Sequence, residues 1–275
     1  MNATTEFGAF DFRRRNALMC ELRHALCEMR DRELREWALK VPLTAAEVSL
    51  RRGRNAKATV WAVGRWIRDE GKMAWEARGE KGLMSHLKRR TKDGVTQTRD
   101  LALSAQGILV DYGKRVKADP RSEAPALVIG VIAFLAASGG LDGDGGIPDL
   151  DLLGGIGAHR SLLTHTIVAG IVVETLARSA ADLTARIHGH LPDPHDSLWD
   201  ILSRGDSNVV EALCTGVSLG LSYHFAVDAT ADAGGAYAAL RGTVAPAVDD
   251  LIQAGNASVE GNDAIRRRGN ANGSR

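Results

Sequence analysis

Hydrophobic and polar positions alternate with a helical period along most of this chain. Between residues 8 and 40, apolar residues recur at steps of three and four with charges between them, which predicts an amphipathic helix. Pro42 is expected to end that helix, and the segment Thr44–Glu47 has the capping-box spacing that begins another. Residues 56–77 and 82–117 continue as polar helical stretches. The pattern therefore predicts an all-α fold, arranged as a helical bundle.

The second half of the chain is more apolar than the first. Ala124–Leu141 has no charged residue and is a candidate membrane span, since a spanning helix needs about 20 residues and about 17 can suffice. Ser161–Ala177 and Ala212–Val227 are two further apolar helices, but they carry His165 and His224. Two interpretations stay open for them. They line a site inside a bundle, or they are buried helices of a soluble protein.

Composition divides the chain into three regions. Residues 1–120 form a basic helical region, and Asp119-Pro120 marks its end. Residues 121–256 form a helical domain with the candidate chemistry, embedded in a membrane in one interpretation. Residues 257–275 are rich in Gly, Asn and Arg and are predicted to be a disordered tail. Aromatic residues make up only 5% of the sequence, which favours close-packed helices.

The near-neutral net charge of the whole chain conceals two opposite halves. Residues 1–123 hold 26 Lys and Arg against 17 Asp and Glu, a net of +9, whereas residues 124–275 hold 9 against 17, a net of −8. Positive residues beside apolar spans are the cytoplasmic signal of membrane proteins. We therefore expect a membrane-associated protein with a cytoplasmic N-terminal half that contacts an anionic lipid surface. Because mean hydropathy is slightly negative, a soluble cytoplasmic protein is the alternative.

Other partners and compartments find less support. A basic half can also bind nucleic acid, but the sequence has no base-reading motif, so nucleic acid is not expected as a partner. The basic surface can also be a merely solvated helical face. The three cysteines form no CxxC pair, so the sequence indicates neither a disulfide framework nor a thiolate zinc site. No apolar run follows the N-terminal arginines, so a secretory signal is not expected.

Ionisable residues gather where the chain is otherwise apolar. The stretch from Ile147 to Thr166, IPDLDLLGGIGAHRSLLTHT, contains Asp149, Asp151, His159, Arg160 and His165. Such groups are costly to desolvate beside apolar helices unless they are paired, bound to a metal or functional. Carboxylates and imidazoles are ligands that zinc, manganese and iron accept. This stretch therefore predicts a metal site, with Arg160 placed to clamp a phosphate or carboxylate.

A second segment repeats the same chemistry about sixty residues later. His224 and Asp228 are four residues apart, which places both on one helical face and suits two ligands of one metal. Each residue also has a structural interpretation. Asp149 can cap a helix, His165 can be a hydrogen-bonded core residue, and His224 can pair with Asp228. Three further histidines are rival candidates for metal ligands, but their polar, proline-containing segment is expected at the surface: His188, His190 and His195.

These two segments resemble the YdjM-like family of membrane-bound metal-dependent hydrolases. The family pattern is a PD-x-D segment, then HR-x-x-TH on an apolar helix, then a histidine and an aspartate on a later helix. The matching residues are Asp149, Asp151, His159, Arg160, Thr164, His165, His224 and Asp228. The resemblance covers about residues 125–230. Because that family is distantly similar to zinc-dependent phospholipases C, the resemblance implies hydrolysis of a phosphoester, including a lipid one.

The leading hypothesis is therefore a metal-dependent hydrolase, with zinc the first expectation and manganese or iron as alternatives. The expected metal ligands are Asp149, Asp151, His159, His165, His224 and Asp228. Asp151 is the expected general base, and Arg160 is expected to stabilise charge on the transferred group. The competing hypothesis is a non-enzymatic helical scaffold or membrane-surface protein, in which the His/Asp cluster has a structural role.

Overall fold

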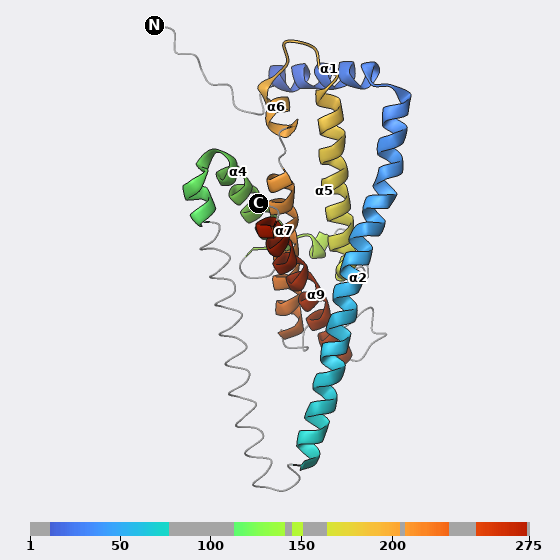
Figure 1. Ribbon diagram of the computed structural model, residues 1–275, viewed down its shortest axis with the longest axis vertical. Helices are drawn as coiled ribbons and strands as arrows, with labels where there is room; N and C mark the ends of the chain where they lie inside the picture. The colour runs from blue at the N-terminus through green and yellow to red at the C-terminus, as the bar shows by residue number, and fades with distance from the viewer. Residues whose placement is uncertain are drawn as a thin grey trace.

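The computed structural model describes residues 12–76, 113–140, 145–150, 164–203, 207–230 and 246–273. Regular secondary structure within these residues is entirely helical, so the predicted all-α fold is confirmed (Figure 1). The helices are α1 (Phe12–Glu28), α2 (Asp31–Glu76), α4 (Pro120–Ser138), α5 (Ile167–His188), α6 (Ser197–Ser203), α7 (Ser207–Thr230) and α9 (Pro246–Gly273).

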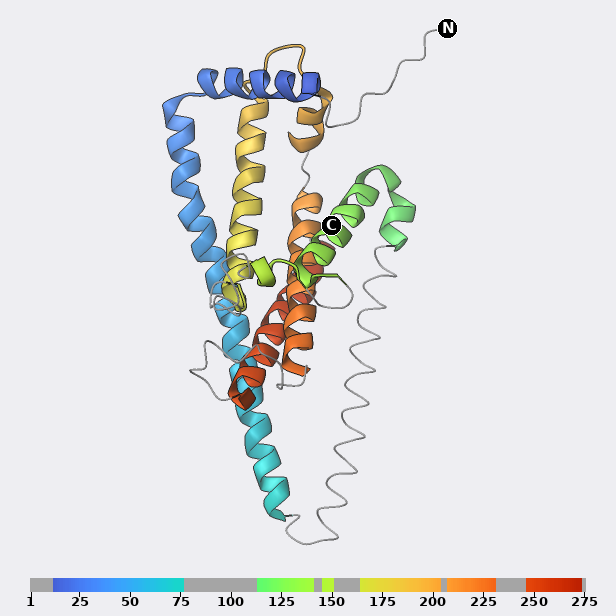
Figure 2. The same cartoon turned by 180° about the vertical axis from the view of Figure 1, so that it is seen from behind.

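The basic N-terminal helices pack on the more apolar C-terminal ones. The long helix α2 runs beside α5 and crosses α9, while α1 lies across the far end of α5 near α6 (Figures 1 and 2). On the other side, α7 packs between α4 and α9. Contacts between the two halves of the sequence thus run along most of α5. The division into domains at residue 120 stays a prediction.

Helices α4 and α7 approach each other through small residues. A Cβ built on Gly216 would overlap the carbonyl oxygen of Gly130, and one built on Gly220 would lie 2.5 Å from the carbonyl oxygen of Phe134. No side chain larger than hydrogen fits at these two positions of α7 without a shift of the backbone. The abundance of Gly and Ala in this half of the sequence therefore serves close contact between helices.

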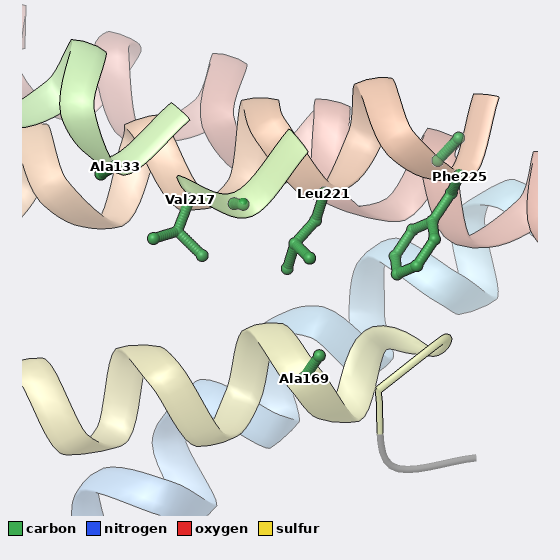
Figure 3. Packing of buried hydrophobic residues seen from close by; sticks show 7 residues of the cluster. Ala133, Ala169, Val217, Leu221 and Phe225 are labelled. Atoms are coloured by element: carbon green, nitrogen blue, oxygen red, sulfur yellow. The ribbon is translucent and has the colours of Figure 1, made fainter. Parts of the chain in front are cut away.

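The apolar core lies beside the candidate site. Val217, Leu221 and Phe225 are spaced by four residues on α7 and point toward Ala169 of α5 (Figure 3). Leu221 and Phe225 are fully buried. Burial of a side chain of this size contributes about 1.5–3 kcal/mol to the stability of the fold. Because His224 directly precedes Phe225, this packing also fixes where the histidine lies.

The break between the first two helices differs from the sequence-based prediction. Helix α1 ends at Glu28 and α2 runs unbroken from Asp31 to Glu76, through Pro42, so the predicted break at Pro42 is wrong. A proline inside a helix costs about 3 kcal/mol. Tertiary contacts on both sides offset this cost. Trp37 donates an indole N–H to the carbonyl oxygen of Ser179 at 2.8 Å, and Val48 is buried.

The candidate membrane-spanning helix in the structure is not the one expected from the sequence. Asn208–Ala229 of α7 is the described helix with the length and composition to cross a membrane, and half of that apolar stretch is buried inside the protein. The segment expected to span, Ala124–Leu141, corresponds to the apolar part of α4, Glu123–Ser138, which is too short to pass the same test. Membrane association therefore remains a prediction.

The expected tail is helical over most of its length. Helix α9 continues to Gly273, and Ala257, Val259 and Ala264 are buried within it. The polar composition that suggested disorder from residue 257 onward has another cause. Several of these polar residues form ion pairs inside the protein.

Those ion pairs belong to a buried cluster, here called the arginine–carboxylate network. Its members are Arg51, Arg52, Glu174, Glu260, Asp263 and Arg267. Arg52 is fully buried and donates from Nε and Nη2 to the two oxygens of Glu260, at 2.9 and 3.2 Å, and from Nη1 to Glu174 at 2.6 Å. A Cβ on Gly170 would lie 2.9 Å from Arg52 Nη2, so the network also needs a glycine there. The network joins α2, α5 and α9.

Candidate metal centre

A glycine-rich turn brings Asp149 back toward α4 and α7. Gly139 and Gly146 have positive φ angles of 76° and 88°, a conformation that favours glycine. The backbone N–H of Ile147 then donates to the carbonyl oxygen of Ala136 at 3.0 Å, which closes the turn against the end of α4. Asp149 follows in a short helical turn, and its Oδ2 accepts the backbone N–H of Gly145 at 2.7 Å.

His165 lies just before α5. Thr166 is the N-cap of that helix, and its side chain accepts the backbone N–H of Val168 at 3.2 Å. The imidazole of His165 is 1% exposed, and its Nδ1 lies 3.1 Å from the hydroxyl oxygen of Thr164. From α9, the side-chain amide of Asn256 donates to the carbonyl oxygen of His165 at 3.1 Å. The cap and this contact together hold the ring in place at the entrance to the helix.

His224 reaches the same place from α7. Its ring is 2% exposed, and Nδ1 lies 3.3 Å from the carbonyl oxygen of Ser138 at the end of α4. A carbonyl oxygen can only accept, so Nδ1 carries the proton of the neutral ring and Nε2 presents a lone pair. Within the described residues Nε2 is buried and has no hydrogen-bond partner. Asp228 stands one turn later on the same face of α7.

The four side chains converge. His165 Nε2 lies 3.5 Å from Asp149 Oδ1 and 3.8 Å from Asp228 Oδ2, and His224 Nε2 lies 3.6 Å from the same Asp228 oxygen. The rings of His165 and His224 meet at a steep angle of 62°, with their centroids 5.6 Å apart. Asp149, His165 and His224 thus form a cluster that could hold a metal ion, since their ligand atoms all lie within 4.8 Å of one another.

The spacing of these atoms suits a metal ion better than direct hydrogen bonds. Donor atoms bound to a tetrahedral zinc ion at about 2.0–2.1 Å lie about 3.4 Å from each other. A lone pair of His224 that faces a carboxylate oxygen would be repulsive unless a cation or a proton lay between them. The two histidines and Asp149 therefore offer two nitrogens and one oxygen that could hold a divalent metal, with the Asp228 carboxylate beside both rings.

The electrostatics of Asp149 agree with a ligand role. Burial opposes ionisation of this carboxyl, but the hydrogen bond to His165, the electrostatic interaction with His224 and the N–H of Gly145 outweigh it, so the pKa of Asp149 is lowered. The carboxylate is thus ionised at neutral pH, which is the form that binds a metal.

The predicted site residues divide into two groups. The structure brings Asp149, His165, His224 and Asp228 together from three separate segments of the sequence. The remaining predicted residues lie outside the described part of the chain: Asp151, His159 and Arg160. The ligand, base and clamp roles given to individual residues stay predictions.

Sequence reasoning missed the arginine–carboxylate network. One signal in the sequence is Glu174, a carboxylate in an otherwise apolar helix. A second is the spacing of Glu260, Asp263 and Arg267, which recur at steps of three and four. Such spacing marks one helical face, and a face that mixes apolar and charged residues is buried only where the charges find partners.

A cavity of about 450 Å³ lies elsewhere, between α2, α5 and α7. Both cations among the residues that line it are already paired. Lys40 binds Asp182 at 2.5 Å, and Arg178 binds Glu211. The cavity therefore has a charged but largely neutralised lining, and neither histidine of the candidate metal centre is among the residues that line it.

Comparisons of this chain with protein-family models, with curated proteins and with solved structures find no match.

Proposed function

We propose that this protein is a metal-dependent hydrolase that acts on a phosphoester. The observation that carries the proposal is the cluster of His165, His224 and Asp149, whose ligand atoms all lie within 4.8 Å of one another, with Asp228 Oδ2 3.8 and 3.6 Å from the two histidine Nε2 atoms. The proton on His224 Nδ1 is held by a backbone carbonyl, an arrangement typical of metal-binding histidines.

Two imidazoles and two carboxylates match the preference of zinc for nitrogen and oxygen ligands, and manganese or iron would also accept them. A divalent metal held by these residues would lower the pKa of a bound water toward about 7 and polarise a phosphoryl oxygen. The protein's contribution is to keep His165 and His224 buried and correctly oriented. Asp149, ionised before any metal binds, adds negative charge that attracts the cation.

The choice of a phosphoester rests on the segment that joins Asp149 to His165 in the sequence. In the proposed reaction Asp151 removes a proton from the attacking water, and Arg160 neutralises charge on the transferred phosphoryl group. The resemblance of the PD-x-D and HR-x-x-TH segments to metal-dependent hydrolases supports this assignment. A lipid phosphoester is the favoured substrate if α7 lies in a membrane.

The first test is the metal content of the protein. The chain would be purified in mild detergent without added metal or chelator and measured by elemental mass spectrometry. The His224→Ala and His165→Ala variants should each lose one equivalent of metal while they keep their helical circular dichroism. His190→Ala is the matched control, because that ring pairs with Glu33 at 2.7 Å, outside the site, and it should keep all its metal.

Activity is then tested on the reconstituted protein. Hydrolysis of chromogenic phosphomonoesters, phosphodiesters and phospholipids should be lost on chelation and restored by zinc. If the wild-type chain holds no His224-dependent metal even after reconstitution, the proposal fails. If metal binds, no phosphoester is turned over and chelation melts the fold, the site is structural and the protein is the helical scaffold of the competing hypothesis.

A further inference from the structure

A second group of histidines gathers at the opposite end of α5. His188 is the last residue of that helix, His195 lies in the connection that follows, and Asp200 is in α6. His188 Nε2 and His195 Nε2 lie 3.0 and 3.1 Å from the same oxygen, Asp200 Oδ1. The two rings are nearly perpendicular, at 86°, with centroids 5.3 Å apart. The sequence predicts a surface segment for these histidines, and the structure brings His188 and His195 to one carboxylate.

We propose that His188, His195 and Asp200 form a second divalent-metal site, separate from the candidate metal centre, whose preferred ion is zinc. Their ligand atoms all lie within 4.8 Å of one another. Zinc sites with three protein ligands keep a further position for water, and these side chains are suitably placed for one. They are partly exposed, at 33%, 21% and 37%, so water can reach them.

The orientation of His195 supports a ligand role. Its Nδ1 lies 3.1 Å from the carbonyl oxygen of Pro192, which can only accept, so Nδ1 carries a proton. Nε2 lies at hydrogen-bond distance from Asp200 Oδ1, so without a metal it donates to that carboxylate, and a bound metal would take the place of this proton. Metal-binding histidines have this pattern, in which a backbone carbonyl fixes the tautomer. The alternative is a doubly protonated His195 that donates to Asp200 without any metal.

The two sites are independent in space. His165 precedes the first turn of α5 and His188 ends its last turn, so the 22 residues of the helix separate them by roughly 33 Å. Figure 1 shows α6 at one end of α5 and the α7–α9 pair near the other. No residue is shared, so loss of one site leaves the ligands of the other intact.

The second site would secure α1 to the rest of the fold. The segment that contains His195 and Asp200 also holds α1 through polar contacts. Arg14 binds both oxygens of Asp196 at 2.8 and 2.9 Å, and Glu21 accepts the indole N–H of Trp199 at 2.8 Å. A metal that ties α6 to the end of α5 therefore stabilises the surface on which α1 rests. This role is structural and differs from hydrolysis.

The test uses the His224→Ala variant, in which the candidate metal centre is disrupted, so that metal uptake reports the second site. After dialysis against a zinc buffer, elemental mass spectrometry should find one equivalent of zinc in this background. Adding Asp200→Asn, which keeps the shape of the side chain, or His195→Ala should abolish it. Adding His190→Ala should not, because His190 lies in the same segment but pairs with Glu33.

A second measurement does not depend on any variant. Cobalt added to the wild-type chain should give visible absorption bands in two steps, one for each site. Amide hydrogen exchange in α1 should slow by up to about 100-fold when free zinc reaches about 100 times its dissociation constant, since opening must release the metal.

Two results would overturn the proposal. One is the absence of zinc from the His224→Ala protein at micromolar free zinc, combined with a single cobalt step in the wild type. The other is equal zinc uptake with and without Asp200→Asn. Loss of His224-dependent metal alone would count against the proposed hydrolase and leave the second site standing.

Discussion

Replacing Arg52 by methionine should destabilise the fold by about 3–5 kcal/mol, the cost typical of removing one partner from a buried ion pair. The Arg52 side chain is fully buried in the arginine–carboxylate network. Methionine fills much of the same space but supplies no charge and no donor. Its effect therefore reports the electrostatic role of the guanidinium more than a loss of packing.

The contacts around Arg52 indicate that this loss of stability arises mainly at Glu260. Glu174 would keep ion pairs with Arg51 and Arg267, so its charge would remain compensated. Glu260 is also fully buried, and Arg52 is the cation that pairs with it in the described part of the chain. The variant would leave that carboxylate uncompensated.

The double variant Arg52→Met/Glu260→Met tests this reasoning directly. Because both charges disappear together, its loss should be smaller than the sum of the single losses by about 2 kcal/mol or more. Urea denaturation followed by circular dichroism would give each free energy of unfolding. Arg32→Met is the matched control, since the Arg32–Glu36 pair is exposed, and it should change stability by no more than about 0.5 kcal/mol.

Two outcomes would refute this account of the network. The first is an Arg52→Met loss below about 1 kcal/mol, which would mean that water or relaxation compensates Glu260. The second is strict additivity of the two substitutions, which would mean that the charges do not interact.

Three further predictions concern packing, acid stability and thiol reactivity. Gly216→Ala should lower the melting temperature by several degrees because its Cβ would overlap the α4 backbone, whereas Gly53→Ala, with open space around it, should leave it unchanged or raise it. Burial opposes ionisation of Glu174, but the charge of Arg267 outweighs it and lowers the pKa of Glu174. As the pH falls, the carboxyl of Glu174 is therefore protonated in the unfolded chain before it is protonated in the folded one. The stability contributed by this group is full above about pH 4.5 and declines as the pH falls below it. Acid titration followed by circular dichroism should show this decline, and Glu174→Gln should flatten it. Ellman's reagent should titrate the two exposed thiols in the native protein and reach Cys214, which is buried, only after denaturation; three reactive thiols in the native state would contradict the packing of α7.

The class of the fold and four residues of the candidate site could be predicted from local patterns in the sequence. Helical periodicity is a local property, so an all-α fold could be predicted from it. Asp149, His165, His224 and Asp228 were identifiable because ionisable groups in apolar segments are costly unless they have partners. The i, i+4 spacing of His224 and Asp228 also fixed their common face without knowledge of the tertiary structure.

Which groups meet in space depends on contacts between distant parts of the chain, and these could not be predicted from the sequence. The sequence could not show that α2 continues through Pro42, because contacts distant in the chain offset the local cost of the proline. It suggested disorder after residue 257, since it contained no sign that arginines some two hundred residues earlier neutralise Glu260 and Asp263. It also placed the second histidine group in a surface segment without revealing a shared carboxylate. In each case the stabilising energy comes from contacts between different helices. A sequence pattern within one segment shows only one of the two partners in such a contact.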